Sequence, residues 1–555
     1  MTVDTAGVGN RPPHFTRRPG KASSLSDAVP GGDVDGDRPT ETSSAGDTVR
    51  VDRRRERILH HRWSMLRGAG AIVIGLWFVG LVTFSTILYG RNFVGQDFGT
   101  YNQAWSLIGQ GHLNPFVTVY GPYTFLKSDF ELIIWPLALL HLVFPSSLTL
   151  LWIQDIAVAG TGLVTYLWIV DYLQRKKLRW TVGVGVAIVI LAVIVVNPEA
   201  YRTLLFDFHM EPLSAFFLVL AGRDLWRGRG RRAWIWIGLT LLCGSFATVT
   251  LIGLGLSAVL VGRDSRRQGV QIIVVALAWS VLISLIGANA GSGIDVSYSY
   301  LAGRNTLHGA SGLVVLVVGM VTHPSRVIDQ LHHRLGAIYT LMKPVGVIGL
   351  ASAWGFGVPF VVLTCNALSA QYGFIFEPFQ SAAAYPFLLF GTVTVLVWLA
   401  QRFKYGWAPG LLVGLLLTVQ ALTYGITTSP GSVRWAIDQV TPGASSQLDR
   451  ALALTPARAE VFAAHGIMGR FSARPSVYFL KSGHTYPVSE REVVFVIDPA
   501  HDRASLADNN AYISFVRDQL HARMLTSGDG VWAFEWRPPK GTTRLTLPPP
   551  IGSEA

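Results

Sequence analysis

The stretch from Gly68 to Tyr89 contains no charged residue and is apolar almost throughout. A helix of this length spans the roughly 30 Å hydrocarbon core of a bilayer, at about 1.5 Å of rise per residue. Leu148 to Val170 is a second run of the same kind. With 50% hydrophobic and only 14% charged residues, the chain is too apolar for a soluble protein. Lipid cannot satisfy open backbone groups, so the sequence predicts an all-α polytopic membrane helix bundle.

Basic clusters at the ends of the apolar runs predict the orientation in the membrane. The cluster RVDRRRERILHHRWSMLR precedes the first run and places the N-terminus in the cytoplasm. The formal net charge of +12 comes from such clusters, so it indicates membrane topology and no nucleic-acid partner. Residues 1–66 begin with a Gly-, Ser- and Asp-rich segment that buries little apolar surface. We expect a disordered cytoplasmic tail there.

Alternating basic and polar loops predict about eleven crossings of the plasma membrane between residues 67 and 428, with the C-terminus extracytoplasmic. The first outer loop is expected at residues 91–146. Within it, FELIIWPLALLHLVF (130–144) is too short to span and is typical of an interfacial helix. The run from Val345 to Ala367 contains AWGFGVP, which predicts a tight hairpin between two half-length crossings.

Residues 429–540 differ in character from the rest of the chain. Short β-rich runs such as SVYFLK and EVVFVIDP alternate with helical stretches such as NNAYISFVRDQLHARML. This pattern predicts a small extracytoplasmic α/β domain. It contains no catalytic motif and suits either acceptor binding or a lid over the outer face. Residues 541–555, rich in proline, are expected to be a disordered end.

The predicted topology brings a set of polar residues to the outer face: Asp97, Lys127, Asp129, Asp207, His209, Glu211 and Arg304. Asp97 follows the first crossing, in GQDFGTYNQAWSLIGQG, and either performs chemistry or caps a helix that starts at Phe98 or Gly99. Asp207, His209 and Glu211 alternate, so an extended backbone would place all three on one side. Such a trio suits metal ligation, and a hydrated loop is the alternative.

Four segments carry a resemblance to a known family: GQDFGTYNQAWSLIGQGH, LVFPSSLTLLWIQ, FDFHMEP and NALSAQYGFIFEPFQSAAAYPFLLF. In order and spacing they resemble the uncharacterised multi-pass membrane proteins of domain of unknown function family 2079, which is allied to the GT-C superfamily of glycosyltransferases. The resemblance covers roughly residues 70 to 500. It implies a GT-C-like architecture, in which an acid of the first outer loop acts near a polyprenyl-phosphate sugar donor.

Asp97 is the position that matches this acid. The chain departs from the expected pattern in two places, where Ser128 and Asp129 replace an Asp-His pair and where Gly244, Ser245 and Phe246 replace a polar turn.

The resemblance thus predicts a membrane glycosyltransferase that moves a sugar from a polyprenyl-phosphate donor to an envelope glycan, lipid or protein. Transfer requires a base for the acceptor hydroxyl, which would be Asp97, and cations for the leaving phosphate. Lys127, Arg202 and Arg304 are the candidate cations. Tyr101 and Trp105 form a candidate sugar-stacking face, with interfacial anchoring as the alternative.

No cofactor is assigned, and a divalent metal stays an open alternative. Two other functions also remain open. A transporter or lipid-handling protein would place acids in mid-membrane, where Asp155 is the example to examine. An inactive envelope scaffold would keep the fold and lose the chemistry.

Overall fold

The computed structural model describes the following residues: 44–90, 94–119, 121–128, 130–176, 178–205, 207–286, 298, 300, 301, 315, 318–370, 378–402, 414, 441–501 and 505–551. Contacts within the chain define two units, residues 1–60 and 61–555. The packing described below lies within the second unit.

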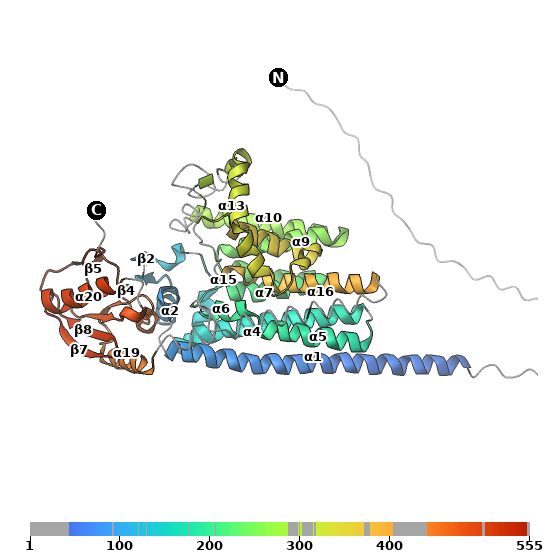
Figure 1. Ribbon diagram of the computed structural model, residues 1–555, viewed down its shortest axis with the longest axis horizontal. Coiled ribbons are helices and arrows are strands. Elements are labelled where there is room, and N and C mark those ends of the chain that lie inside the picture. Colours follow the sequence, from blue (N-terminus) through green and yellow to red (C-terminus); the bar gives the residue numbers. More distant parts are fainter. Residues whose placement is uncertain are drawn as a thin grey trace, which may run out of the picture. The chain divides into compact units, whose positions relative to one another are not determined.

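The first part of the chain is a bundle of apolar helices (Figure 1). Five segments of the described chain are long and apolar enough to cross a bilayer: His60–Gly90 of α1 (Ser44–Gly90), α4 (Leu148–Arg175), Trp180–Leu205 across α5 (Trp180–Val195) and α6 (Pro198–Leu205), Ser265–Ile286 of α10 (Arg263–Ile286), and α16 (Ala384–Arg402). Shorter helices complete the bundle: α7 (Glu211–Trp226), α8 (Gly230–Leu241), α9 (Phe246–Val261), α13 (Pro324–Met342), α14 (Ala353–Leu368) and α15 (Pro378–Ser381). The predicted all-α polytopic class is confirmed, and the number of crossings stays a prediction.

Two predictions about the bundle are wrong. Part of the N-terminal tail, expected to be disordered to residue 66, is helical, because α1 already begins at Ser44. The hairpin predicted at AWGFGVP does not form, since α14 runs through this motif with Pro359 inside the helix.

The glycines of AWGFGVP serve close helix packing instead of a turn. A Cβ atom added at Gly355 would lie 2.2 Å from the carbonyl oxygen of Gly349, in the 3₁₀ helix η3 (Val347–Ala351). One added at Gly357 would lie 2.3 Å from the carbonyl oxygen of Gly253 in α9. Small residues allow backbones to approach this closely in membrane bundles, and sequence alone does not separate that use of glycine from a turn.

Residues 94–144 form a compact segment between α1 and α4. Its core is α2 (Gln96–Gly109), followed by the short strands β1 (Phe116–Val117) and β2 (Tyr123–Thr124) and the 3₁₀ helix η1 (Phe125–Lys127). The predicted interfacial stretch contains α3 (Ile134–Ala138) and the 3₁₀ helix η2 (Leu139–Leu142). Leu139, Leu142 and Val143 are each at least 65% exposed there. Exposed leucines on a short helix suit the membrane interface, as predicted.

The C-terminal part is a three-layer α/β domain, which agrees with the predicted α/β class (Figure 1). Its five strands are ordered β4 (Val477–Phe479), β3 (Glu460–Ala463), β6 (Val493–Ile497), β8 (Val531–Trp536) and β7 (Arg523–Gly528). The first three are parallel, and β8 runs antiparallel to its neighbours on both sides. Side chains alternate along β3, so that Val461 packs with α19 (Pro442–Leu454) and Phe462 with α20 (Leu506–Ser514) on the other face.

Residues 541–551 are ordered, which corrects this part of the predicted disorder of residues 541–555, and residues 552–555 lie outside the described residues. Arg544–Thr546 form β9, which pairs antiparallel with β5 (Thr485–Pro487). Leu545 and Leu547 are buried in the core on the α20 side. These two leucines alternate with threonine and arginine, a strand pattern that the surrounding prolines obscured.

Candidate functional site

The site is centred on Asp97 in the first turn of α2. The helix begins at Gln96 and Gly95 is its N-cap, so Asp97 is the second helical residue. The structure therefore does not support the alternative in which Asp97 caps a helix starting at Phe98 or Gly99. Its side chain is 28% exposed. A carboxylate in this position is favoured by the helix dipole and stays accessible to a ligand.

His209 lies between two carboxylates. Its Nε2 atom is 3.7 Å from Oδ2 of Asp97, and its Nδ1 atom is 3.8 Å from Oε2 of Glu211, the first residue of α7. The imidazole stacks on the ring of Phe379 from α15, with the ring centroids 3.7 Å apart and the planes at 4°. Three of the predicted site residues thus come together as Asp97, His209 and Glu211.

The backbone before His209 is held in an unusual conformation. Asp207 has a φ of 76°, in the left-handed region that aspartate tolerates better than most residues. Its Oδ1 atom accepts a 2.7 Å hydrogen bond from the Gly95 amide. Gln154 of α4 donates to the Asp207 carbonyl oxygen at 3.0 Å and accepts from the His209 amide at 2.8 Å. Asp207 therefore ties the segment before α7 to Gly95 at the start of α2, while His209 and Glu211 face Asp97.

Tyr101 lies one turn after Asp97 and is bound to a buried acid. Its hydroxyl donates a 2.6 Å hydrogen bond to Oε1 of Glu131, and its ring contacts that of Phe208 edge-on at 5.2 Å. Glu131, Gln154 and Phe379 contact the site residues, and the sequence did not predict them as part of the site. The sequence offers little to distinguish these three residues, because each is a single residue within or beside an apolar run.

The C-terminal domain packs against the same turns of α2. Asn102 donates to Ser472 at 2.8 Å, and Gln103 donates to the carbonyl oxygens of Arg474 and Pro475 at 3.0 and 2.9 Å. The Arg474 guanidinium donates to backbone carbonyls, including that of Phe471, and burial lowers its pKa to about 10. The joint is polar and buried, and these hydrogen bonds hold the C-terminal domain on α2, although the buried Oδ1 atom of Asn102 has no hydrogen-bond partner among the described residues.

The remaining predicted residues lie elsewhere. Lys127 is exposed at the end of η1. Trp105 is fully buried, where its Nε1 donates to the Leu137 carbonyl oxygen and its ring contacts His141, so protein covers both of its faces. Asp129 and Arg304 lie outside the described residues. In the described part of the chain, no group of three or more His, Cys, Asp or Glu residues is arranged to hold a metal ion.

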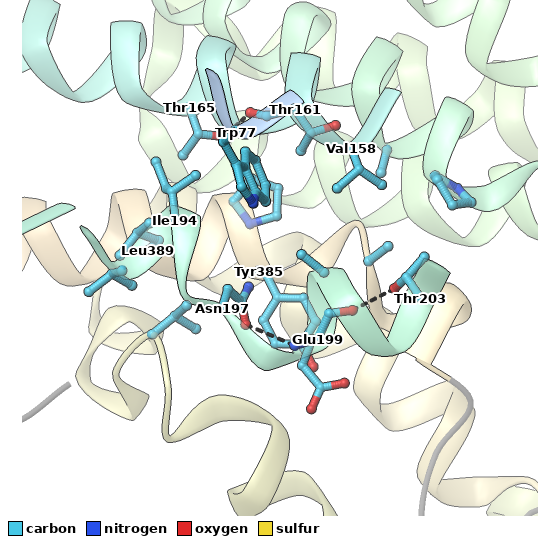
Figure 2. A pocket seen from close by; sticks show the side chains of 18 residues that line it. Trp77, Val158, Thr161, Thr165, Ile194, Asn197, Glu199, Thr203, Tyr385 and Leu389 are labelled. Atoms are coloured by element: carbon cyan, nitrogen blue, oxygen red, sulfur yellow. Dashed lines mark hydrogen bonds between the residues drawn. The ribbon is translucent and has the colours of Figure 1, made fainter. Parts of the chain in front are cut away.

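Arg202 forms a 2.9 Å ion pair with Glu199 on α6, and Glu199 lines a largely apolar pocket within the bundle. Figure 2 shows Trp77, Ile194 and Leu389 on one side of the pocket and Glu199 near Tyr385 on the other. Pro212, the residue after Glu211, also lines it. The pocket therefore begins one residue from the candidate site.

Asp155, the acid noted within an apolar run, is fully buried on α4, where its Oδ1 accepts a 2.8 Å hydrogen bond from Ser85 of α1. It thereby joins two membrane helices. The next residue toward the N-terminus is Gln154, which holds the His209 backbone. Asp155 is therefore next in sequence to a residue that contacts the candidate site.

The family model described as a predicted membrane protein (DUF2079) matches residues 93–532. The chain belongs to this family. The matched range contains Asp97, His209 and Glu211, and four of the five strands of the C-terminal sheet, and it ends within β8. No curated protein matches the chain.

Among solved structures, the crystal structure of ArnT from Cupriavidus metallidurans in the apo state aligns at 14% identity with a TM-score of 0.38. The alignment covers 85% of this chain and 97% of that chain.

Proposed function

We propose that the protein is a membrane glycosyltransferase that moves a sugar from a polyprenyl-phosphate donor to an acceptor of the cell envelope, with Asp97 as the general base. The observation that supports this most directly is the arrangement of Asp97, His209 and Glu211. An accessible carboxylate next to an imidazole, itself beside a second carboxylate, can accept a proton and hold it by electrostatic attraction.

The proposed reaction requires two contributions from the protein, which are the base and positive groups near the phosphate. The acceptor oxygen bonds to the anomeric carbon of the sugar while its proton passes to Asp97. The bond between that carbon and the phosphate oxygen breaks, and the polyprenyl phosphate leaves with the electron pair. Positive groups stabilise the departing phosphate. Lys127 is the exposed candidate among the described residues, whereas the Arg202 charge is partly balanced by Glu199.

The surroundings of the site support a lipid-linked substrate. Asp97 is seven residues beyond the end of α1, a helix that is long and apolar enough to cross a bilayer. Exposed leucines of η2 in the same segment suit contact with the membrane interface. These features support a reaction in which a membrane-anchored donor and an acceptor beneath the C-terminal domain meet at Asp97.

The test compares Asp97→Asn with Asp518→Asn, a matched change at an exposed position of the C-terminal domain. Purified protein would be given metabolically labelled polyprenyl-phosphate sugars extracted from the host membrane, and label transferred to membrane acceptors would be counted. Asp97→Asn should lower transfer by roughly 10²- to 10⁴-fold, because it removes the base. Its thermal unfolding should match that of wild type and of Asp518→Asn.

Wild-type levels of transfer by a folded Asp97→Asn protein would contradict the assignment of the base. No transfer by the wild-type protein from any labelled donor would favour the scaffold alternative. Export of labelled lipid without sugar transfer would favour a transporter.

A further inference from the structure

A cluster of arginines surrounds one buried carboxylate at the end of the bundle away from Asp97. Asp171 of α4 accepts from Arg67 of α1 at 3.0 Å and from Arg223 of α7 at 2.9 Å. Arg227, the C-cap residue of α7, also pairs with Asp171, and Arg67 donates to Gln174. The side chain of Asp171 is only 7% exposed, whereas those of the three arginines are 15–27% exposed.

The charges in this cluster do not balance. Three guanidinium groups share one carboxylate, which leaves two formal positive charges. The neighbouring Asp224 is paired with Arg232 at 3.3 Å, and Arg175 adds another cation above the ring of Trp226 at 4.0 Å. The Nε atom of Arg223 is buried and has no hydrogen-bond partner. A buried donor without an acceptor, beside excess positive charge, favours a bound anion.

The position of the cluster indicates the source of that anion. Arg67 and Gly90 are 23 residues apart on α1, which corresponds to about 35 Å, so the distance along the helix from the cluster to the end that leads to Asp97 is close to the roughly 30 Å thickness of a bilayer core. On α1, Met65 and Ile72 flank Arg67 in sequence and are 62% and 67% exposed. Apolar surface for acyl chains therefore lies next to guanidinium groups at headgroup depth.

We propose that Arg67, Arg223 and Arg227 form a binding site for the phosphate of an anionic membrane lipid. The planar guanidinium fork matches phosphate oxygens in pairs, and a part of each of the three side chains is exposed to a ligand. The phosphate supplies the negative charge that Asp171 alone does not provide. The bound lipid would thereby hold α1, α4 and α7 together at this face. The inference does not depend on the reaction proposed at Asp97.

The experiment measures lipid binding to the purified full chain by native mass spectrometry, with phosphatidylglycerol and phosphatidylcholine as probes. Arg227→Gln removes the arginine at the C-terminal end of α7. Arg402→Gln is the matched control. It removes the same charge at the same membrane face, because its neighbour Gln401 donates to the Lys176 carbonyl oxygen at the end of α4.

Wild-type protein should prefer phosphatidylglycerol, and Arg227→Gln should weaken its binding roughly tenfold. Arg402→Gln should change binding by no more than about twofold. Arg227→Lys keeps the charge but loses the planar guanidinium group, so its binding of phosphatidylglycerol should lie between those of Arg227→Gln and Arg402→Gln. It also replaces Arg227→Gln as the test variant if Arg227→Gln does not fold. Thermal unfolding of each variant separates loss of binding from loss of structure.

Equal losses in Arg227→Gln and Arg402→Gln would overturn the proposal, because they would indicate a diffuse surface charge. Full displacement of phosphatidylglycerol by inorganic phosphate would overturn the assignment to a lipid and identify a soluble phosphate ligand. Resistance to inorganic phosphate, with the expected order of variants, would support the lipid site.

Discussion

At the scale of single residues, Asp97, His209 and Glu211 were accessible to sequence reasoning because each borders an apolar run, where a charged side chain is costly unless it has a use. The distances between these three side chains could not be predicted from the sequence. His209 reaches Asp97 only because Gln154 of α4 holds its backbone and Asp207 bonds to the Gly95 amide. Both contacts join segments more than 50 residues apart, and no local pattern encodes them.

The contact between Gly95 and Asp207 gives a prediction for the site's rigidity. A Cβ atom at Gly95 would lie 2.7 Å from Oδ2 of Asp207, so Gly95→Ala must displace that carboxylate. We expect a loss of about 1–3 kcal/mol in the free energy of unfolding, from overpacking and the disturbed hydrogen bond. Thermal or denaturant unfolding of the purified protein measures it. Gly80→Ala in α1, where a Cβ meets no atom within 4 Å, is the control and should be no less stable than wild type. Equal stability of the two variants would show that the Gly95 contact is dispensable.

At the scale of elements, apolar length and basic flanks predicted the membrane helices, and period-two runs predicted the α/β domain. Both patterns reflect which side chains are buried, and the spacing of apolar residues in the local sequence predicts this well. The failures at AWGFGVP and at Arg544–Thr546 both involve glycine or proline. The glycines of AWGFGVP allow close helix packing where a turn was predicted, and the prolines around Arg544–Thr546 obscured a strand. The joint between α2 and the C-terminal domain was also beyond prediction. It uses Asn102 and Gln103, whose amides have no preferred partner until both surfaces are in place.

The joint gives a prediction at this scale. Gln103 is fully buried. Its Oε1 atom accepts from the Thr118 backbone amide, and its Nε2 atom donates to the carbonyl oxygens of Arg474 and Pro475. Gln103→Leu leaves these groups buried without partners, at roughly 1–3 kcal/mol for each group. Hydrogen exchange should become faster in residues 116–119 and 474–479, while the sheet strands β6 and β8 keep their protection. Gln110→Leu, at the exposed end of the same helix, is the control. Unchanged exchange in Gln103→Leu would mean that other contacts hold the domain on α2.

At the scale of the whole molecule, the structure separates two polar sites by the length of α1. The Arg67 cluster lies toward one end of this helix, and Asp97 with the C-terminal domain lies beyond its other end. Positive charge is enriched on cytoplasmic loops, so we expect the end with the arginines to face the cytoplasm. The proposed donor and acceptor then require the Asp97 site to face outward.

Cysteine labelling of intact cells tests this orientation. Cys243 and Cys365 would first be changed to serine, and a single cysteine introduced at an exposed position, His112, Arg229 or Lys540. A membrane-impermeant maleimide should label His112→Cys, beyond α2, and Lys540→Cys, in the C-terminal domain, without permeabilisation. Arg229→Cys lies in the turn between α7 and α8, two residues from Arg227, and should react only after the membrane is opened. Labelling of Arg229→Cys in intact cells would reverse the orientation. It would place Asp97 in the cytoplasm, where soluble sugar nucleotides, not an outward-facing lipid-linked donor, would be the expected sugar source.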